Sequence, residues 1–292
     1  MLRRFRLEEP ETVQEASALL SKHGESARIY SGGTELLLAM KEGLVRYESL
    51  VNVKKISGLN GIKIEDGTIH IGALCTHRNL EASTQLQASL PAMVEMECRV
   101  ANLRVREVGT IGGNLSFAEP HADPGPFLLS LGANLIAQNA SSSREIPLEK
   151  FFVDAFETCL EQDEVLTGIR IPFPVARSGT RYLKFGHLER PSVGVALHLA
   201  LNGDGGSIGV ARLAVGCVGP KPCRVEEAEE LLKGKSLKAA VSVLGQAGGL
   251  AARAGQAITD IHGSADYKEH IVQVLLARAF NGISQELTKR KG

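Results

Sequence analysis

The chain has 292 residues, of which 43% are hydrophobic, and its 33 Lys and Arg residues balance its 33 Asp and Glu residues. This length is typical of about two domains, and a formal net charge of +0 argues against nucleic-acid binding as the main function. Since about 18 apolar residues nowhere follow one another, the sequence predicts no helix that spans a membrane.

The beginning of the chain predicts a small unit of parallel strands. Thr12 has the spacing of a helix cap, three residues before Glu15, and apolar residues then recur on one helical face up to Leu20. Three further elements follow, a strand, a helix and a strand over residues 27–30, 35–41 and 50–53. This order and spacing make a βαβ unit with a parallel sheet.

After residue 60 the pattern changes to antiparallel structure. Isoleucines alternate with polar residues on both sides of Asp66-Gly67, which is a strong signal for a two-residue hairpin turn. Thr76 has the residue type of a helix cap, and Pro91 favours the start of a second short helix. Residues 104–126 are rich in Gly and Pro and lack a clean period, so we expect a long loop there. Loops of this length are usually functional.

The second half of the chain predicts a separate domain. A helix over 127–131 and strands over 134–138 and 165–171 precede a Pro-rich segment, which indicates a domain boundary near residue 176. Beyond it, apolar strands over 193–201 and 208–215 predict a second hairpin. Helices are expected over 225–232, 236–252 and 267–283. The fold class is therefore α+β.

Five cysteines occur in the chain, and none forms a Cys-x-x-Cys pair. This spacing argues against a zinc, iron–sulfur or thioredoxin site and indicates a reduced, cytoplasmic protein. The cysteines are Cys75, Cys98, Cys159, Cys217 and Cys223.

A glycine-rich motif between the strand over 27–30 and the next helix is the first candidate binding site. It consists of Ser31, Gly32, Gly33, Thr34 and Glu35. Free N–H groups and the positive end of the helix dipole favour an anion such as phosphate there, and the absence of Cβ lets the backbone approach it. The alternative is a tight turn in which a Thr hydroxyl satisfies the helix start.

A second motif repeats this chemistry later in the chain. It consists of Thr110, Ile111, Gly112, Gly113 and Asn114. Two such motifs suggest one extended diphosphate ligand, whereas the alternative is a hairpin bulge in which Asn114 caps its own turn. Asp123 is a candidate acceptor for sugar hydroxyls, or simply begins a turn before Pro124.

With both motifs in this order, the chain resembles the FAD-binding medium subunits of the molybdenum hydroxylases, which include xanthine dehydrogenases and aerobic carbon monoxide dehydrogenases. The matching segments are Tyr30–Leu36, Ile71–Thr76, Thr110–Asn114, Glu164–Pro172 and Ala265–His270. The resemblance implies a PCMH-type, vanillyl-alcohol-oxidase-like FAD-binding domain of two α/β subdomains over residues 1–176. It also implies a domain over residues 177–292 similar to the carbon monoxide dehydrogenase flavoprotein C-terminal domain, with a small antiparallel sheet and helices.

The resemblance assigns roles to single residues. Residues 31–35 and 110–114 would hold the FAD diphosphate, and Asp123 would bind a hydroxyl of the ribose or ribityl chain. Leu166 would cover part of the flavin, and Lys184 would lie near its pyrimidine end, where positive charge stabilises reduced flavin. The alternative for Lys184 is a solvated strand lysine.

Other polar residues are interpreted as structural, and we predict neither a catalytic residue nor a metal site in this chain. His121 is interpreted as a loop histidine without a catalytic role. Glu95, Glu97 and Cys98 are expected to form a solvated helix face and a buried thiol. His187, Glu189 and Arg190 are interpreted as surface residues.

By resemblance, the chain transfers electrons within a complex. A small partner subunit would carry the [2Fe-2S] clusters, a large one the molybdenum cofactor, and NAD or another small molecule would be the acceptor.

Two departures from carbon monoxide dehydrogenases, at Gly32-Gly-Thr-Glu35 and at Ser192, argue against carbon monoxide as the substrate. The alternatives are a stand-alone FAD-dependent oxidase or reductase of the same fold, and a nucleotide-binding or scaffold protein whose glycine motifs are only turns.

Overall fold

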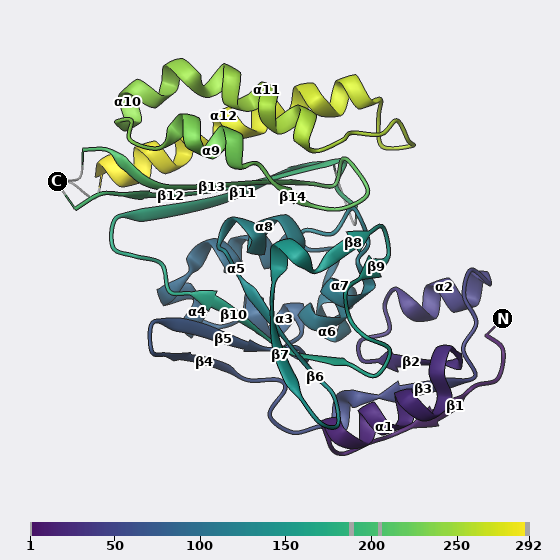
Figure 1. Cartoon of the computed structure of the whole chain (residues 1–292). Coiled ribbons are helices and arrows are strands. Elements are labelled where there is room, and N and C mark those ends of the chain that lie inside the picture. Colours follow the sequence, from purple (N-terminus) through teal and green to yellow (C-terminus); the bar gives the residue numbers. More distant parts are fainter. Residues whose placement is uncertain (1, 187–189, 204–205, 290–292) are drawn as a thin grey trace.

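The computed structural model describes residues 2–186, 190–203 and 206–289 (Figure 1). The expectations for His187 and Glu189 therefore lie outside the described residues. The N-terminal unit is a three-stranded parallel sheet in the order β1-β3-β2, with one helix packed against it. Its elements are β1 (Arg6–Glu8), α1 (Val13–His23), η1 (Gly24–Ser26), β2 (Ala27–Tyr30), α2 (Leu36–Glu42), β3 (Ser49–Asn52) and η2 (Val53–Lys55).

The predicted βαβ unit is confirmed, and its local signals act as expected. The Thr12 hydroxyl accepts the N–H of Glu15 at 3.1 Å, while the Glu15 carboxylate accepts the N–H of Glu11 at 2.8 Å rather than that of Thr12. Gly43 ends α2 in the left-handed conformation. The sequence did not predict β1, because three residues are too few to show a period.

The second sheet has five strands in the order β4-β5-β10-β6-β7, all antiparallel. The predicted hairpin turn is confirmed, since Asp66 and Gly67 both have positive φ, as a two-residue turn between twisted strands requires. The strands are β4 (Ile62–Glu65), β5 (Thr68–Gly72), β6 (Asn134–Gln138), β7 (Ser143–Pro147) and β10 (Val165–Pro172). A two-stranded sheet of β8 (Phe152–Asp154) and β9 (Glu157–Thr158) follows η3 (Leu148–Lys150).

Six short helices cover one side of this sheet: α3 (His77–Glu81), α4 (Thr84–Ser89), α5 (Pro91–Glu97), α6 (Leu103–Val108), α7 (Ile111–Phe117) and α8 (Pro124–Ser130). The expectation of a long loop over 104–126 is therefore wrong. The cause is that α6 and α7 begin at side-chain caps, Asn102 and Thr110, and are too short for a helical period to be visible.

The C-terminal part is an antiparallel sheet in the order β11-β12-β13-β14, with helices stacked on its outer face (Figure 1). The strands are β11 (Ser178–Phe185), β12 (Val193–Leu201), β13 (Ile208–Gly216) and β14 (Cys223–Arg224). The helical segments are α9 (Glu226–Leu232), α10 (Leu237–Ala240), η4 (Val241–Val243), α11 (Leu244–Ala254) and α12 (Ala265–Lys289). The predicted hairpin is confirmed, whereas the single helix expected over 236–252 is divided into three segments.

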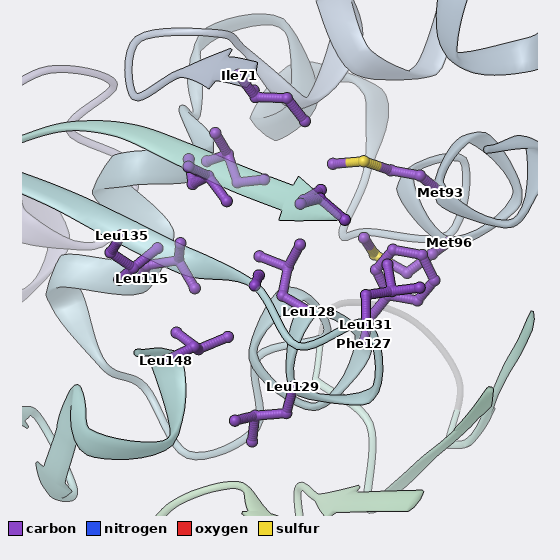
Figure 2. Close-up of a cluster of buried hydrophobic side chains, with 14 of the residues drawn as sticks. Ile71, Met93, Met96, Leu115, Phe127, Leu128, Leu129, Leu131, Leu135 and Leu148 are labelled. Carbon is purple, nitrogen blue, oxygen red and sulfur yellow. The ribbon is translucent and has the colours of Figure 1, made fainter. Parts of the chain in front are cut away.

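Helix α8 lies between the two large sheets, and its apolar side chains join the core of the five-stranded sheet (Figure 2). Phe127 and Leu128 are 0% exposed there. A second core joins β12 and β13 to α11 and α12. Because α8 is held from both sides, the segment before it, which ends at Asp123, is fixed in place. No helix among the residues that the structure describes has the length and apolar character to cross a membrane.

Candidate functional site

The two glycine motifs meet at one cavity of about 330 Å³, lined by residues of both the parallel and the five-stranded sheets. This volume lies in the range of small-molecule sites. The predicted residues that line it are Ser31, Gly32, Gly33, Thr34, Glu35, Thr110, Gly112, Gly113, Asn114, Asp123 and Leu166. Two predicted residues do not line the cavity. Ile111 is buried in the core beside it, and Lys184 donates a hydrogen bond to the cavity-lining Asp123.

Glycine brings the two motifs into contact. A Cβ added at Gly32 would lie 2.3 Å from the carbonyl oxygen of Val108, and one at Gly113 would lie 2.8 Å from Thr110 Oγ1 and 3.0 Å from Ser31 Oγ. The hydroxyls of Ser31 and Thr110 share a buried hydrogen bond of 3.0 Å. These glycines are therefore required for the packing of one motif against the other, before any ligand is considered.

The backbone of the second motif is engaged within the protein. Thr110 caps α7, and its Oγ1 accepts the N–H of Gly113 at 3.1 Å. The N–H groups of Ile111, Gly112 and Asn114 donate to carbonyl oxygens of Cys75, Ala73 and Thr110. The hairpin-bulge alternative is therefore wrong. The Asn114 side chain is different, because its Oδ1 is buried and has no hydrogen-bond partner within residues 2–186, 190–203 and 206–289.

The first motif has free backbone donors. Within the described ranges, the N–H groups of Gly32, Gly33 and Thr34 make no hydrogen bond to the protein. Helix α2 has Glu35 at its N-cap, with no capping bond from a side chain, so the alternative of a Thr hydroxyl satisfying the helix start is wrong. Polar groups in a cavity normally have partners. Three free donors from the first motif fit an anionic group such as the FAD diphosphate, and the unpartnered Asn114 oxygen fits a hydroxyl or amine donor on the same ligand.

A buried ion pair lies where the segment before α8 lines the cavity. Asp123 is 2% exposed; its Oδ2 accepts from Lys184 Nζ at 2.9 Å and its Oδ1 from the Tyr182 hydroxyl at 2.8 Å. Burial raises the pKa of Asp123, and the nearby Lys184 charge opposes this rise. Lys184 also donates to the carbonyl of Arg99, and its side chain is 10% exposed, so the solvated-lysine alternative is wrong. The two charges act as a unit rather than as a free cation.

Leu166 lines the cavity from the central strand β10. The pairing of β10 with β6 shifts by one residue between Leu166 and Gly168, which is a β-bulge. Bulges re-aim side chains next to functional sites. Leu166 is thus an apolar surface on the cavity wall.

The sequence analysis missed a second buried pair. His77 lines the cavity, and its Nδ1 lies 2.7 Å from Glu97 Oε2, with the two residues 2% and 0% exposed. The expected solvated face of α5 is wrong for Glu97, and the expected buried thiol is wrong, because Cys98 is exposed. The signal was available in the sequence. Glu97 lies four residues after the buried Met93 and so falls on the same helix face.

A third group lies where the cavity meets the C-terminal part. His121 lines the cavity; its Nδ1 is 3.1 Å from Glu119 Oε1, and its Nε2 is 3.5 Å from Asp260 Oδ2. Its ring also packs on that of His262, with centroids 4.6 Å apart. Arg190, expected on the surface, lines the same cavity and pairs with Glu35 at 3.0 Å.

Comparison with known proteins gives a family match for each part of the chain. Residues 3–174 match the family of the FAD binding domain in molybdopterin dehydrogenase, and residues 186–283 match the CO dehydrogenase flavoprotein C-terminal domain. The carbon monoxide dehydrogenase medium chain of Hydrogenophaga pseudoflava is 30% identical over 279 residues, which cover 95% of this chain and 96% of that protein. The medium chain from Afipia carboxidovorans is 32% identical over 275 residues, covering 94% and 95%.

A solved structure shows the same similarity in three dimensions. The carbon monoxide dehydrogenase from Hydrogenophaga pseudoflava that lacks the Mo-pyranopterin moiety superposes with a TM-score of 0.92 at 31% identity. The match covers 96% of this chain and 97% of that chain, and it confirms the α+β fold of an FAD-binding domain followed by an antiparallel sheet with helices. The chain therefore belongs to the family of FAD-binding medium subunits of the molybdenum hydroxylases.

Proposed function

We propose that this chain holds FAD between its two glycine motifs and passes electrons from the [2Fe-2S] clusters of a small partner subunit to an external acceptor. A large partner subunit with the molybdenum cofactor would oxidise the substrate. The observation that carries the proposal is the cavity in which the N–H groups of Gly32, Gly33 and Thr34 and the Oδ1 atom of Asn114 have no hydrogen-bond partner among the residues that the structure describes. The name medium chain of the Hydrogenophaga and Afipia relatives supports the subunit organisation.

Each cavity residue has a role in this proposal. The N–H groups of Gly32, Gly33 and Thr34 donate to the diphosphate, and Asn114 Oδ1 accepts from a hydroxyl or amine of the ligand. Leu166 excludes water from the flavin. The Asp123–Lys184 pair presents polar atoms to the ribityl chain or the flavin while remaining neutral as a unit. Bound FAD supplies the redox chemistry, because flavins take up electrons singly and release them as a pair.

We also propose that the FAD-binding domain, of the PCMH type, spans residues 1–176 and that the C-terminal domain spans residues 177–292. The short connection between β10 and β11 supports a boundary there. Limited proteolysis followed by mass spectrometry tests it, since cleavage confined to this connection is the expected result.

The function is tested with the chain purified without partners. It should be yellow, bind one FAD, become reduced with dithionite and oxidise no aldehyde, purine or carbon monoxide. Substrate oxidation should appear only when partner subunits supply molybdenum and iron–sulfur clusters. Turnover by protein in which elemental analysis finds neither molybdenum nor iron would overturn the electron-transfer role.

A stand-alone FAD-dependent oxidase or reductase is the second candidate, because the cavity contains the acid–base groups that such an enzyme needs. His77 and His121 both line it, each beside a carboxylate. Bleaching of the flavin by a small substrate, in the isolated chain and without dithionite, would favour this candidate.

A further inference from the structure

His77 lies where the two glycine motifs meet. Its backbone N–H donates to the carbonyl of Gly109 at 3.0 Å. A Cβ added at Gly109 would be 3.3 Å from His77 Cδ2, the ring atom bonded to Nε2, and 3.6 Å from Thr34 Oγ1. This edge of the imidazole therefore faces the same small space as the first motif, whose N–H groups are free.

The opposite edge of the ring is fixed by Glu97. Nδ1 lies 2.7 Å from Glu97 Oε2, and Glu97 Oε1 is buried with no hydrogen-bond partner in the described part of the chain. Nε2 makes no hydrogen bond within the part of the chain that the structure describes, while the residue lines the cavity. Among the described residues, only the Nδ1 edge of His77 therefore has a hydrogen-bond partner, and the Nε2 edge is open toward the cavity.

We propose that His77 binds the FAD diphosphate through an Nε2–H group and that the His77–Glu97 pair takes up one proton when FAD binds. The proposal rests on the proposed binding of FAD between the glycine motifs and assigns a cofactor contact outside both of them.

The uptake follows from the number of protons that the His77–Glu97 pair holds. When the pair holds two protons, either Glu97 is neutral and His77 carries its proton on Nε2, or Glu97 is ionised and His77 is an imidazolium. Both arrangements are neutral overall, and in both Nε2–H donates toward the cavity. When the pair loses one proton, it becomes negative and places a bare nitrogen lone pair against the diphosphate. FAD binding therefore favours the doubly protonated pair.

The surrounding charges do not replace this proton. Glu81 on the same helix is paired with Arg78 and Arg106, and Asp123 is paired with Lys184. Cys75, also near Glu97, stays neutral because burial raises its pKa to about 11. Burial likewise raises the pKa of Glu97, with His77 opposing this rise, so the carboxyl side of the pair holds its proton more tightly than a solvated glutamate.

Proton uptake on binding makes the affinity for FAD fall as pH rises. A group whose pKa is raised by binding favours binding below its free-state pKa, and this advantage is lost as pH rises through the bound-state pKa. The dissociation constant for FAD should therefore increase with pH over the window between these two pKa values, by up to about tenfold per unit.

The experiment is calorimetric titration of FAD into the FAD-stripped full chain at several pH values, in two buffers with different heats of ionisation. Wild type should take up as much as one proton per FAD. His77→Gln should take up none and bind about 10- to 100-fold more weakly at the low-pH end, as expected for loss of a hydrogen bond to a charged group. His198→Gln is the matched control, because His198 is a buried histidine bonded to Thr180 and remote from the cavity, and it should behave as wild type.

Glu97→Gln separates a proton-linked role from a purely structural one. The amide can donate to His77 Nδ1 and so keep Nε2–H aimed at the cavity without a titrating carboxyl, so this variant should bind FAD with an affinity that does not depend on pH.

If both variants fail to fold, NMR of the wild-type chain with 15N-labelled histidine decides, since one Nε2 must gain a proton on FAD addition. Equal proton uptake in wild type and His77→Gln, or none in wild type, overturns the proposal. Failure of wild type to bind FAD at any pH would instead overturn the proposed function.

Discussion

Two buried glutamates, Glu97 on α5 beside the cavity-lining His77 and Glu229 on α9 of the C-terminal part, differ in how completely their charge is satisfied. Glu229 is 0% exposed, and its carboxylate accepts from the Leu213 N–H and from two nitrogens of Arg224. Glu97 is equally buried, but among the described residues it has His77 as its partner at one oxygen and none at the other. A saturated buried charge holds a fold together, whereas an incomplete one marks a place where a ligand or proton completes the network.

Individual glycines also differ in how closely other atoms approach the position of the missing Cβ. Around the cavity they allow two backbones to approach more closely than any Cβ would permit, as at Gly32 and Gly112. In the outer helices, Gly245 has open space around its missing Cβ. Substitutions at the cavity and in the rest of the fold test whether the two regions differ in this way.

Gly113→Val should have the largest effect, a complete loss of FAD. Its side chain would push apart Thr110 and Ser31, whose hydroxyls join the two motifs. The visible absorbance of the gel-filtered protein measures the retained flavin. Gly61→Val is the control, because nothing lies within 4 Å of that missing Cβ. Normal flavin content in Gly113→Val would show that the motifs do not need this contact.

Lys184→Met should lower the free energy of unfolding by about 3–5 kcal/mol, because it leaves the buried Asp123 carboxylate without its cation. It should also lower the flavin midpoint potential, since negative charge near the flavin disfavours its reduced form. Asp123→Asn should shift the potential in the opposite direction. A redox titration in which both variants move the potential the same way would contradict this electrostatic account.

Arg224→Met tests the saturated glutamate. It leaves Glu229 buried without a cation and should cost about 3–5 kcal/mol in denaturant unfolding. Glu97→Gln should cost under about 1 kcal/mol, because Oε1 already lacks a partner and the amide preserves a hydrogen bond to His77. Equal costs would remove the distinction between the two glutamates.

His198 should make folding stability depend on pH. Burial, aided by Arg212, lowers its pKa from 6.5 to about 4, so the folded state binds fewer protons than the unfolded state in this window. The contribution of His198 to the free energy of unfolding is therefore fully present above pH 6.5, and about 3 kcal/mol of it is lost as pH drops to 4. His198→Gln should flatten this part of the stability curve, measured by urea unfolding at each pH.

Asn114→Ala should have the smallest effect, a roughly fivefold weaker binding of FAD, because one neutral hydrogen bond contributes about 1 kcal/mol. The stability of the FAD-free chain should stay within about 0.5 kcal/mol, since Oδ1 has no protein partner to lose. Fluorescence quenching of FAD measures the affinity. A large loss of stability with unchanged affinity would identify Asn114 as a structural residue.

Much of the fold follows from local sequence signals. The Asp66-Gly67 turn, the Thr12 cap and the apolar strands of the C-terminal hairpin were all predicted, because each depends on residues close together in the chain. The short helices α6 and α7 were not, since α7 contains two glycines that disfavour helix and the stability of both helices comes from caps and packing.

The sequence by itself determined the two glycine motifs, since each of them consists of consecutive residues. Only the tertiary structure decided which of those groups remain free. It joins Ser31 to Thr110 across 79 positions, neutralises Lys184 with Asp123 across 61, and buries Glu97 against His77. Such pairings depend on how distant elements pack, and packing is what converts an exposed polar residue into a buried, charge-sensitive one.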